Sequence, residues 1–250
     1  MNNKTEKLQK VLARAGIGSR RMMEEWISQG RIQVNGTAAT LGMRVSEQDK
    51  IKVNGRFIKF PEMGATPRVL LYHKPAGEVC TRKDPEGRAT VFEALPKHQG
   101  GRWVSIGRLD YNTAGLLLFT DSGEFANQLM HPSANLEREY AVRLFGAVEA
   151  PVIQKLKAGL ELEDGFARFE NIIDAGGQGA NHWYHVIVKE GRNRIVRRLW
   201  ESQAITVSRL IRVRFGPVAL PRRLPQGKWQ ELNAKEISDL IKSLKERTAP

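Results

Sequence analysis

The stretch GRLDYNTAGLLLFT, residues 107–120, joins a polar turn to an apolar strand. The residues after Arg108 are typical of turns, because Asp, Asn and Thr side chains bond to the nearby backbone and Gly accepts tight bends. The apolar run LLLF then predicts a central, buried strand. This order places a single carboxylate, Asp110, at the mouth of that strand and two positions after an arginine.

Two interpretations of Asp110 follow from these residues. In the simpler one, the side chain only closes a turn. In the other, it is a reactive group at the edge of a buried strand. Partial burial would raise the pKa of that carboxyl, an arginine within a few ångströms would lower it, and a paired carboxylate would stay ionised. The residues alone leave both interpretations open.

Positive charge is concentrated in two separate blocks of the chain. Residues 1–60 hold 12 Lys and Arg against 5 Asp and Glu, and residues 189–228 hold 11 against 2, whereas residues 61–188 hold 13 against 16. The net charge of the whole chain is +13. This pattern favours nucleic acid as a partner over a generally solvated basic surface.

Signals for export or membrane insertion are missing from the sequence. It contains no apolar run long enough to span a bilayer, and the start MNNKTEKLQK lacks the apolar core of a signal peptide. The single Cys80 has no partner for an internal disulfide, which fits a reducing compartment. We therefore expect a cytoplasmic protein with no membrane partner.

The first 60 residues predict a small domain of two helices and short strands. Apolar residues recur at helical spacing from Leu8 to Ala15, and glycines follow. Ser19 is a good N-cap for a second helix, which Gly30 would end. The segments IQVNG and IKVNG, at 32–36 and 51–55, each close on Asn-Gly and predict hairpin turns.

A second, larger domain is predicted after a linker. FPEMGATPR, at 60–68, has no periodicity and contains two prolines and a glycine, so we assign 1–60 to the first domain, 61–68 to the linker and 69–250 to the second domain. Beyond it, short β-rich runs such as VLLYHK, YAVRLF, HVIVK and LIRVRF alternate with helical segments such as EFANQLM and RIVRRLWES. The expected class is α+β, with a mainly antiparallel sheet.

Several familiar kinds of site are excluded by missing motifs. The chain has no GxxxxGK[ST] for a nucleoside triphosphate, no GxGxxG for a dinucleotide and no GxSxG for a serine hydrolase. Only His182 and His185 are close together among the scattered histidines, and the one cysteine is far from them. We expect no metal and no cofactor.

The basic segment KEGRNRIVRRLWE, residues 189–201, predicts a helix after a tight turn. Arg194, Arg197 and Arg198 would share one face of it, opposite Ile195, Val196 and Leu199. Such a face is either solvated or lays guanidinium groups on RNA phosphates, with one arginine reaching inward to Asp110. Tyr140 in REYAVRLF is likewise either a core residue or a platform on which an extruded base stacks.

The start of the chain resembles the S4 RNA-binding fold. The resemblance is carried by KLQKVLARAG, SRRMMEEWI and GRIQVNG, within residues 7 to about 55. It implies that structured RNA binds along the second helix and the adjoining loop, through Arg14, Ser19, Arg20, Arg21 and Arg31. The alternative is that these arginines only keep a small domain soluble, but their clustering at a helix start favours phosphate contact.

Nearly the whole chain resembles the pseudouridine synthases that modify bacterial ribosomal RNA. The motifs that carry this resemblance are GRLDYNTAGLLLFTDSGEFANQLMHP, LLYHKPAGEVCT, LEREYAVRLFG and KEGRNRIVRRLW. It implies isomerisation of a specific uridine in large-subunit (23S) ribosomal RNA, or in an assembly intermediate of it. Separately, we expect the protein to be a monomer. The bond from ribose C1′ to N1 of uracil is broken, the base turns, and C1′ is joined to C5, so no cofactor is required.

The resemblance also assigns roles to residues. Asp110 would be the essential carboxylate, by attack on C1′, removal of a ribose proton or addition to the base. Arg108 would fill the gap left by the flipped nucleotide and Tyr140 would stack on the uracil. Arg197, with Arg194 as a second candidate, would pair with Asp110, and Leu210 would pack under the base. Apart from the resemblance, the basic helix face predicted above would bring Arg198 into contact with RNA.

Two rival functions follow from the same sequence. One is a non-catalytic RNA-binding or ribosome-assembly protein with the same fold. The other is the same enzyme acting on small-subunit RNA or on another uridine, because no residue spells out which uridine is modified.

Overall fold

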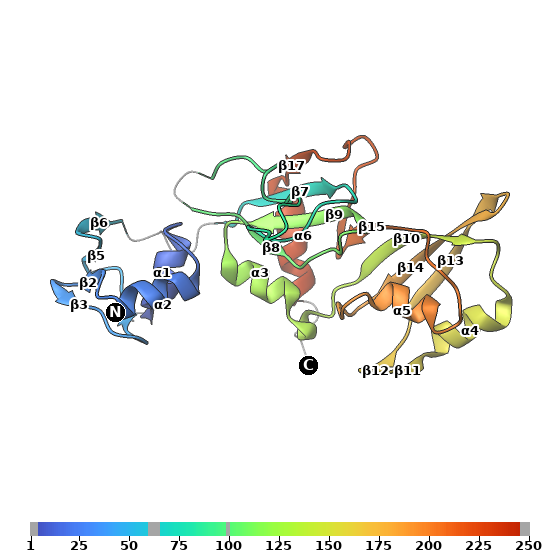
Figure 1. Cartoon of the computed structure of the whole chain (residues 1–250), viewed down its shortest axis with the longest axis horizontal. Helices are drawn as coiled ribbons and strands as arrows, with labels where there is room; N and C mark the ends of the chain where they lie inside the picture. The colour runs from blue at the N-terminus through green and yellow to red at the C-terminus, as the bar shows by residue number, and fades with distance from the viewer. Residues whose placement is uncertain (1–4, 60–65, 99–100, 246–250) are drawn as a thin grey trace. The chain divides into compact units, whose positions relative to one another are not determined.

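A computed structural model of the chain (Figure 1) describes residues 5–59, 66–98 and 101–245. The described residues form two compact units. The first comprises those of Met1–Pro67, Pro96–Val104 and Asp121–Gly123, and the second those of Arg68–Leu95, Ser105–Thr120 and Glu124–Pro250. Residues 61–65 of the expected linker lie outside the described part, and the domain boundaries stay a prediction.

The first unit contains the two predicted helices, α1 at Leu8–Arg14 and α2 at Arg20–Ser28. Ser19 caps α2, because its Oγ accepts a hydrogen bond from the Met22 amide at 3.1 Å. The apolar faces of both helices pack on the inner residues of a small sheet to make this unit's core. The predicted helix-capping role of Ser19 is therefore confirmed.

Short antiparallel strands complete the first unit. Asn35 and Asn54 adopt positive φ angles of 52° and 48°, as the predicted Asn-Gly hairpin turns require. The sheet order is β3-β2-β5-β6, and β1 pairs with β4 separately. The bounds are β1 Glu6–Lys7, β2 Ile32–Val34, β3 Thr37–Ala38, β4 Arg44–Val45, β5 Ile51–Val53 and β6 Arg56–Ile58.

A mixed but mainly antiparallel sheet dominates the rest of the chain (Figure 1). Its order is β13-β14-β10-β15-β9-β7-β17, with β16 beside β15 and β8 beside β9. The bounds are β7 Val69–Lys74, β8 Val104–Ile106, β9 Ala114–Thr120, β10 Arg138–Phe145, β13 Asn171–Gln178, β14 Asn181–Val188, β15 Arg209–Phe215, β16 Val218–Ala219 and β17 Trp229–Glu231. The predicted α+β class is confirmed.

Helices and a hairpin accompany this sheet. On α5, Trp200 lies 5.8 Å, ring centre to ring centre, from Tyr184 of β14, so α5 covers that face of the sheet. Among the described residues, no helix has the length and apolar character needed to cross a membrane. The bounds are α3 Gly123–Met130, a 3-10 turn Pro132–Ala134, α4 Ala150–Ala158, β11 Leu160–Leu162, β12 Gly165–Ala167, α5 Ile195–Glu201 and α6 Ala234–Lys245.

The sheet is continuous through one short parallel contact between β9 and β15. The paired residues are Ala114 with Ile211 and Gly115 with Arg212. Gly115 has a φ of 108°, and a Cβ placed on it would lie 2.2 Å from the backbone oxygen of Arg212. Only glycine fits here, so this residue allows β15 to approach the turn that precedes β9.

Candidate active site

The turn at Asp110 closes through its backbone. The Thr113 amide donates to the Asp110 carbonyl oxygen at 3.0 Å, and β9 begins at the next residue, Ala114. The Asp110 side chain is half-buried. No hydrogen bond or ion pair from residues 5–59, 66–98 or 101–245 reaches its carboxylate. The turn therefore forms without using the carboxylate, which is left available to a ligand.

Lys74, the last residue of β7, supports this turn from inside the protein. Its side chain is fully buried. Its Nζ donates to the carbonyl oxygens of Thr113 at 2.9 Å, Pro75 at 3.0 Å and Asp110 at 3.2 Å. Burial lowers the pKa of the Lys74 ammonium, and nearby negative groups, Asp110 among them, oppose that shift.

Sequence reasoning missed Lys74. The signal was a charged residue at the end of the apolar strand VLLYHK, directly before a proline. A buried lysine is tolerated only when its donors are satisfied, so its presence in such a strand indicates a specific set of acceptors. Here those acceptors are the carbonyl groups around the Asp110 turn.

Arg197 reaches the same turn from α5, but through the backbone. It is 8% exposed, and its two Nη atoms donate to the carbonyl oxygens of Val207 at 2.8 Å and Asn112 at 3.1 Å. The expected ion pair with Asp110 is not formed within 4.0 Å in the described structure. Burial lowers the pKa of the Arg197 guanidinium, and the carboxylate of Asp110 opposes this.

The expectation that Arg194, Arg197 and Arg198 share one helix face is wrong. Helix α5 begins only at Ile195, and Arg194 precedes it in the left-handed conformation, with φ 50°. Arg194 pairs with Glu201 at 3.0 Å, whereas Arg197 points inward. The positive φ of Arg194 breaks the helical spacing on which the expectation depended.

Arg198 is held by a carboxylate within its own unit. It donates to Asp164, in the turn between β11 and β12, at 2.8 Å, and Arg192 donates to the same carboxylate at 2.9 Å. Hydrogen bonding from Arg198, helped by the charge of Arg192, lowers the pKa of Asp164 to about 2. Arg108, in contrast, is exposed and forms no ion pair with a described residue.

Tyr140 and Leu210 lie on the same face of the sheet. Tyr140 of β10 is directly opposite Arg212 of β15, and Val142 is directly opposite Leu210. Tyr140 is 9% exposed and Leu210 4%. Directly opposed residues share a face, so these four side chains form one surface next to α5.

Arg212 is a second buried cation that sequence reasoning missed. It is 2% exposed, and its Nε donates to the carbonyl oxygen of Leu116 at 2.7 Å. Its Nη2 has no hydrogen-bond partner in the described residues. The signal was an arginine at an inward position of the apolar strand RLIRVRF. A buried guanidinium with a donor to spare can hold an anionic or carbonyl group.

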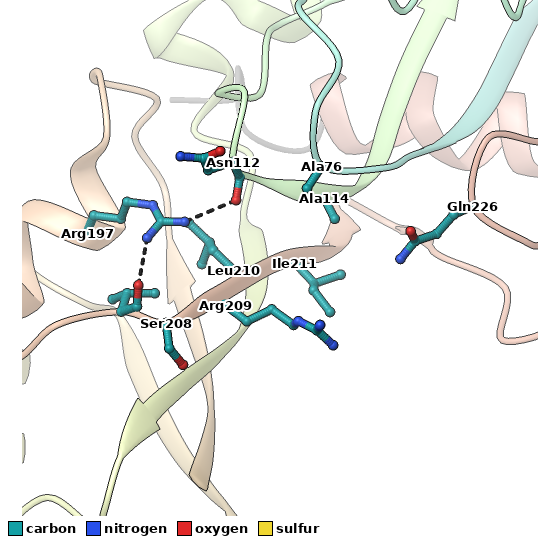
Figure 2. Close-up of a pocket in the computed structure, with 10 residues that line it drawn as sticks. Ala76, Asn112, Ala114, Arg197, Ser208, Arg209, Leu210, Ile211 and Gln226 are labelled. Carbon is teal, nitrogen blue, oxygen red and sulfur yellow. Dashed lines mark hydrogen bonds between the residues drawn. The ribbon is translucent and has the colours of Figure 1, made fainter.

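A cavity of about 460 Å³ opens where the Asp110 turn, α5 and β15 meet. Figure 2 shows its lining, in which Arg197 donates toward Asn112 and Leu210 lies beside them. Asp110 and Tyr140 are not among its lining residues, although Asn112 is two positions after Asp110. The volume suits a small ligand such as a nucleobase. The lining residues are Ala76, Asn112, Ala114, Arg197, Val207, Ser208, Arg209, Leu210, Ile211 and Gln226.

The expected RNA-contact residues of the first unit differ in how far they are already engaged. Arg20 and Arg21 are exposed and form no ion pair with a described residue. Arg31 stacks over Trp26, with its Cζ 3.9 Å from the ring centre. Arg14 pairs with Glu6 at 2.8 Å, and Ser19 is occupied as the cap of α2. Arg20 and Arg21 are therefore the most accessible of the set.

No group of three or more His, Cys, Asp or Glu residues suited to a metal ion occurs within the described ranges. The charged groups described in this region are the half-buried carboxylate of Asp110 and the buried cations Lys74, Arg197 and Arg212.

Comparisons with known proteins point to one family. A family model described as RNA pseudouridylate synthase matches residues 68–202, and an S4 domain model matches residues 6–51. A solved structure described as a pseudouridylate synthase superimposes with a TM-score of 0.65 at 25% identity, covering 94% of this chain and 99% of that one.

Curated relatives are similar over most of this chain. The ribosomal large subunit pseudouridine synthase B of Pseudomonas aeruginosa is 58% identical over 237 residues, which is 94% of this chain but only 61% of that protein's length. The protein of the same name in Vibrio cholerae is 55% identical over 238 residues, covering 94% of this chain and 74% of the relative.

Proposed function

The chain belongs to the RNA pseudouridylate synthase family, and we propose that it isomerises a specific uridine of large-subunit (23S) ribosomal RNA to pseudouridine. The names of the relatives support this choice of RNA. The observation that carries the proposal is the Asp110 carboxylate, which is half-buried and yet accepts no hydrogen bond from a described residue.

The reaction balances without a co-reactant. The bond between C1′ and N1 is broken, the base turns within the site, C1′ bonds to C5, and the proton on C5 is released while N1 gains one. Direct attack on C1′, removal of a ribose proton and addition to the base all require a carboxylate beside the flipped nucleotide. Asp110 is the residue we assign to that position.

The surrounding residues have distinct tasks in this proposal. Lys74 and Arg197 hold the turn through its carbonyl groups, so the carboxylate stays unbonded and correctly placed. Tyr140 gives the base a surface to stack on, and Leu210 excludes water beneath it. Arg108, exposed at the turn, takes the place of the extruded base.

Most of the RNA-binding residues in this proposal lie outside the catalytic site. We assign Arg20, Arg21 and Arg31 to phosphate contacts, because they are exposed near the start of α2 or on the loop after it. A monomer that acts in the cytoplasm on ribosomal RNA or on an assembly intermediate completes the proposal.

Tritium release tests the activity directly. Ribosomal RNA carrying 5-tritiated uridine should lose tritium to water when incubated with the chain, from large-subunit RNA and not from small-subunit RNA. Mapping of pseudouridine in a strain that lacks the gene should show one missing site in 23S RNA. Binding without tritium release would indicate a non-catalytic RNA-binding protein, and a missing site in 16S RNA would reassign the substrate.

A further inference from the structure

Strands β13, β14, β10 and β15 form one half of the large sheet, and one face of this half is partly open to solvent. Side chains of β14 alternate in burial: Tyr184 and Val186 are buried under the side covered by α5, whereas Trp183 and His185 are half-exposed on the other side. This alternation is typical of a sheet with one packed and one solvated face.

A row of two arginines and a tryptophan crosses this open face. Arg143 of β10 is directly opposite Arg209 of β15 and directly opposite Trp183 of β14. Directly opposed side chains share a face with their Cβ atoms about 5 Å apart. We call Arg209, Arg143 and Trp183 the basic row.

The charge of the basic row is not neutralised within the described structure. No described carboxylate lies within 4.0 Å of either guanidinium, and Arg143 donates only to the Ser208 hydroxyl at 3.0 Å. Two like charges directly opposite each other destabilise a strand pair. Other basic residues of this unit, such as Arg198 and Arg214, are paired with carboxylates.

We propose that the basic row binds a single-stranded RNA segment that leaves the cavity. Arg209 also lines the cavity (Figure 2), so the row begins at the edge of that cavity and continues along the face of the sheet opposite Tyr140 and Leu210. Arg209 and Arg143 would contact successive phosphates, and Trp183 would stack on a base. This inference rests on the proposed function, because it extends the path of the same RNA.

The same face carries exposed apolar residues, which raises the question of a protein partner. Phe145 is 69% exposed and Ile173 48%. A second copy of the chain would meet this face through a two-fold interface and bring Arg143 and Arg209 against their own copies. Burying unpaired like charges is costly, so the charge favours a polyanion over a protein surface.

Salt-dependent binding of an unstructured uridine oligonucleotide tests the proposal. For Arg143→Gln with Arg209→Gln, we expect about tenfold weaker binding near 0.1 M salt. The slope of log affinity against log salt should fall by about 1.4, because each single-strand phosphate contact contributes roughly 0.7. Trp183→Leu should weaken binding about tenfold and leave the slope unchanged, because stacking releases no counterions.

The matched control removes two arginines that are already paired with carboxylates. Arg68→Gln with Arg168→Gln loses the same net charge from ion pairs with Glu231 and Glu170. If the two double variants have superimposable salt plots, the proposal is wrong. If the double variant of the basic row does not fold, the single variant Arg143→Gln replaces it in the test, and the expected decrease in slope is then about 0.7.

Two further measurements separate this proposal from its rivals. Sedimentation of the wild type should show a monomer; a dimer that dissociates on Phe145→Ser would reassign the open face to a second copy. Tritium release by the wild type is measured independently. Absence of tritium release would overturn the proposed function but would leave the binding result valid. If the enzyme is active but its slope of log affinity against log salt is unchanged by the substitutions in the basic row, only the inference about the basic row is wrong.

Discussion

The ammonium of Lys74 lies 3.2 Å from the carbonyl oxygen of Asp110, so the proposed catalytic residue is bonded to a buried cation through its backbone and not through its carboxylate. The same ammonium also binds the carbonyl of Thr113 at 2.9 Å, three residues further along. One lysine thus fixes both ends of the turn while the reactive oxygens stay unbonded. This arrangement separates the group that positions Asp110 from the chemistry assigned to it.

Replacing Lys74 should reduce activity more than RNA affinity. In Lys74→Met the carbonyls of the turn lose their donor, and a displacement of about 1 Å can cost roughly a hundredfold in rate. We expect kcat for tritium release to fall by about that factor with RNA affinity within threefold. Lys83→Met, at an exposed lysine, is the control. Equal losses of rate and affinity would indicate general unfolding rather than a positioning role.

Asp110→Asn should abolish pseudouridine formation and leave RNA affinity within a few fold. The amide keeps the shape of the side chain but cannot act as a nucleophile or base, whereas binding is spread over many phosphates. Single-turnover tritium release and filter binding measure the two effects. Asp174→Asn, an exposed carboxylate on β13, should retain activity. If Asp110→Asn forms pseudouridine at the wild-type rate, the assignment of Asp110 as the essential carboxylate is wrong.

Arg20→Gln with Arg21→Gln should weaken RNA binding and lower its salt dependence. Each lost phosphate contact removes at most about one counterion equivalent, so the slope should change by about two at most. Affinity measured at several salt concentrations checks this. Arg56→Gln with Lys59→Gln removes the same charge from exposed positions around β6 and should change the slope less.

Gly115→Ala should destabilise the protein by roughly 3 kcal/mol or more, because the new Cβ meets backbone that cannot move aside. Gly146→Ala is the control. Gly146 also has a positive φ, 75°, but a Cβ there would meet nothing within 4 Å, so it should cost only about 1 kcal/mol. Denaturant unfolding of both variants measures the difference in the free energy of unfolding. Similar losses in the two variants would show that the positive φ, and not the contact with Arg212, causes the destabilisation.

The pairing of Asp164 should make stability depend on pH at the acid end. Its pKa falls from the ordinary value of 3.8 to about 2 in the fold, so the folded state prefers the ionised form. The stabilisation is present above pH 4 and is lost as pH falls toward 2. Thermal melting of wild type and Asp164→Asn should therefore differ near neutral pH and converge near pH 2. A constant difference would mean that the ion pair contributes nothing.

Local signals sufficed for much of the fold. The Asn-Gly turns at Asn35 and Asn54, the cap at Ser19 and the apolar runs of β7 and β9 each depend on a few neighbouring residues, and all were predictable. The α+β class followed from the order of such segments. These features depend on backbone preferences and periodicity, which are properties of short sequences.

The supports of the candidate site were less predictable. Lys74 and Arg197 donate to backbone carbonyls of the Asp110 turn that are distant from them in sequence. Every residue has a backbone carbonyl, so the sequence pattern does not indicate which one accepts a hydrogen bond. The left-handed conformation of Arg194 is uncommon for a residue with a side chain, so helical spacing misplaced it. Resemblance selected Asp110, whereas tertiary contacts determine how it is held.

The pairing of β9 with β15 connects the two groups of residues that make up the candidate site. Asp110 and Lys74 belong to the side of the sheet built on β7 and β9, whereas Tyr140 and Leu210 belong to the side built on β10 and β15. Within the sheet, the two sides are paired over two residues, where Gly115 is opposite Arg212. The spacing between the Asp110 carboxylate and the stacking surface proposed for Tyr140 therefore depends on this pairing. We therefore expect a change in this pairing to alter the rate of the proposed reaction even though Asp110, Lys74, Tyr140 and Leu210 are all retained.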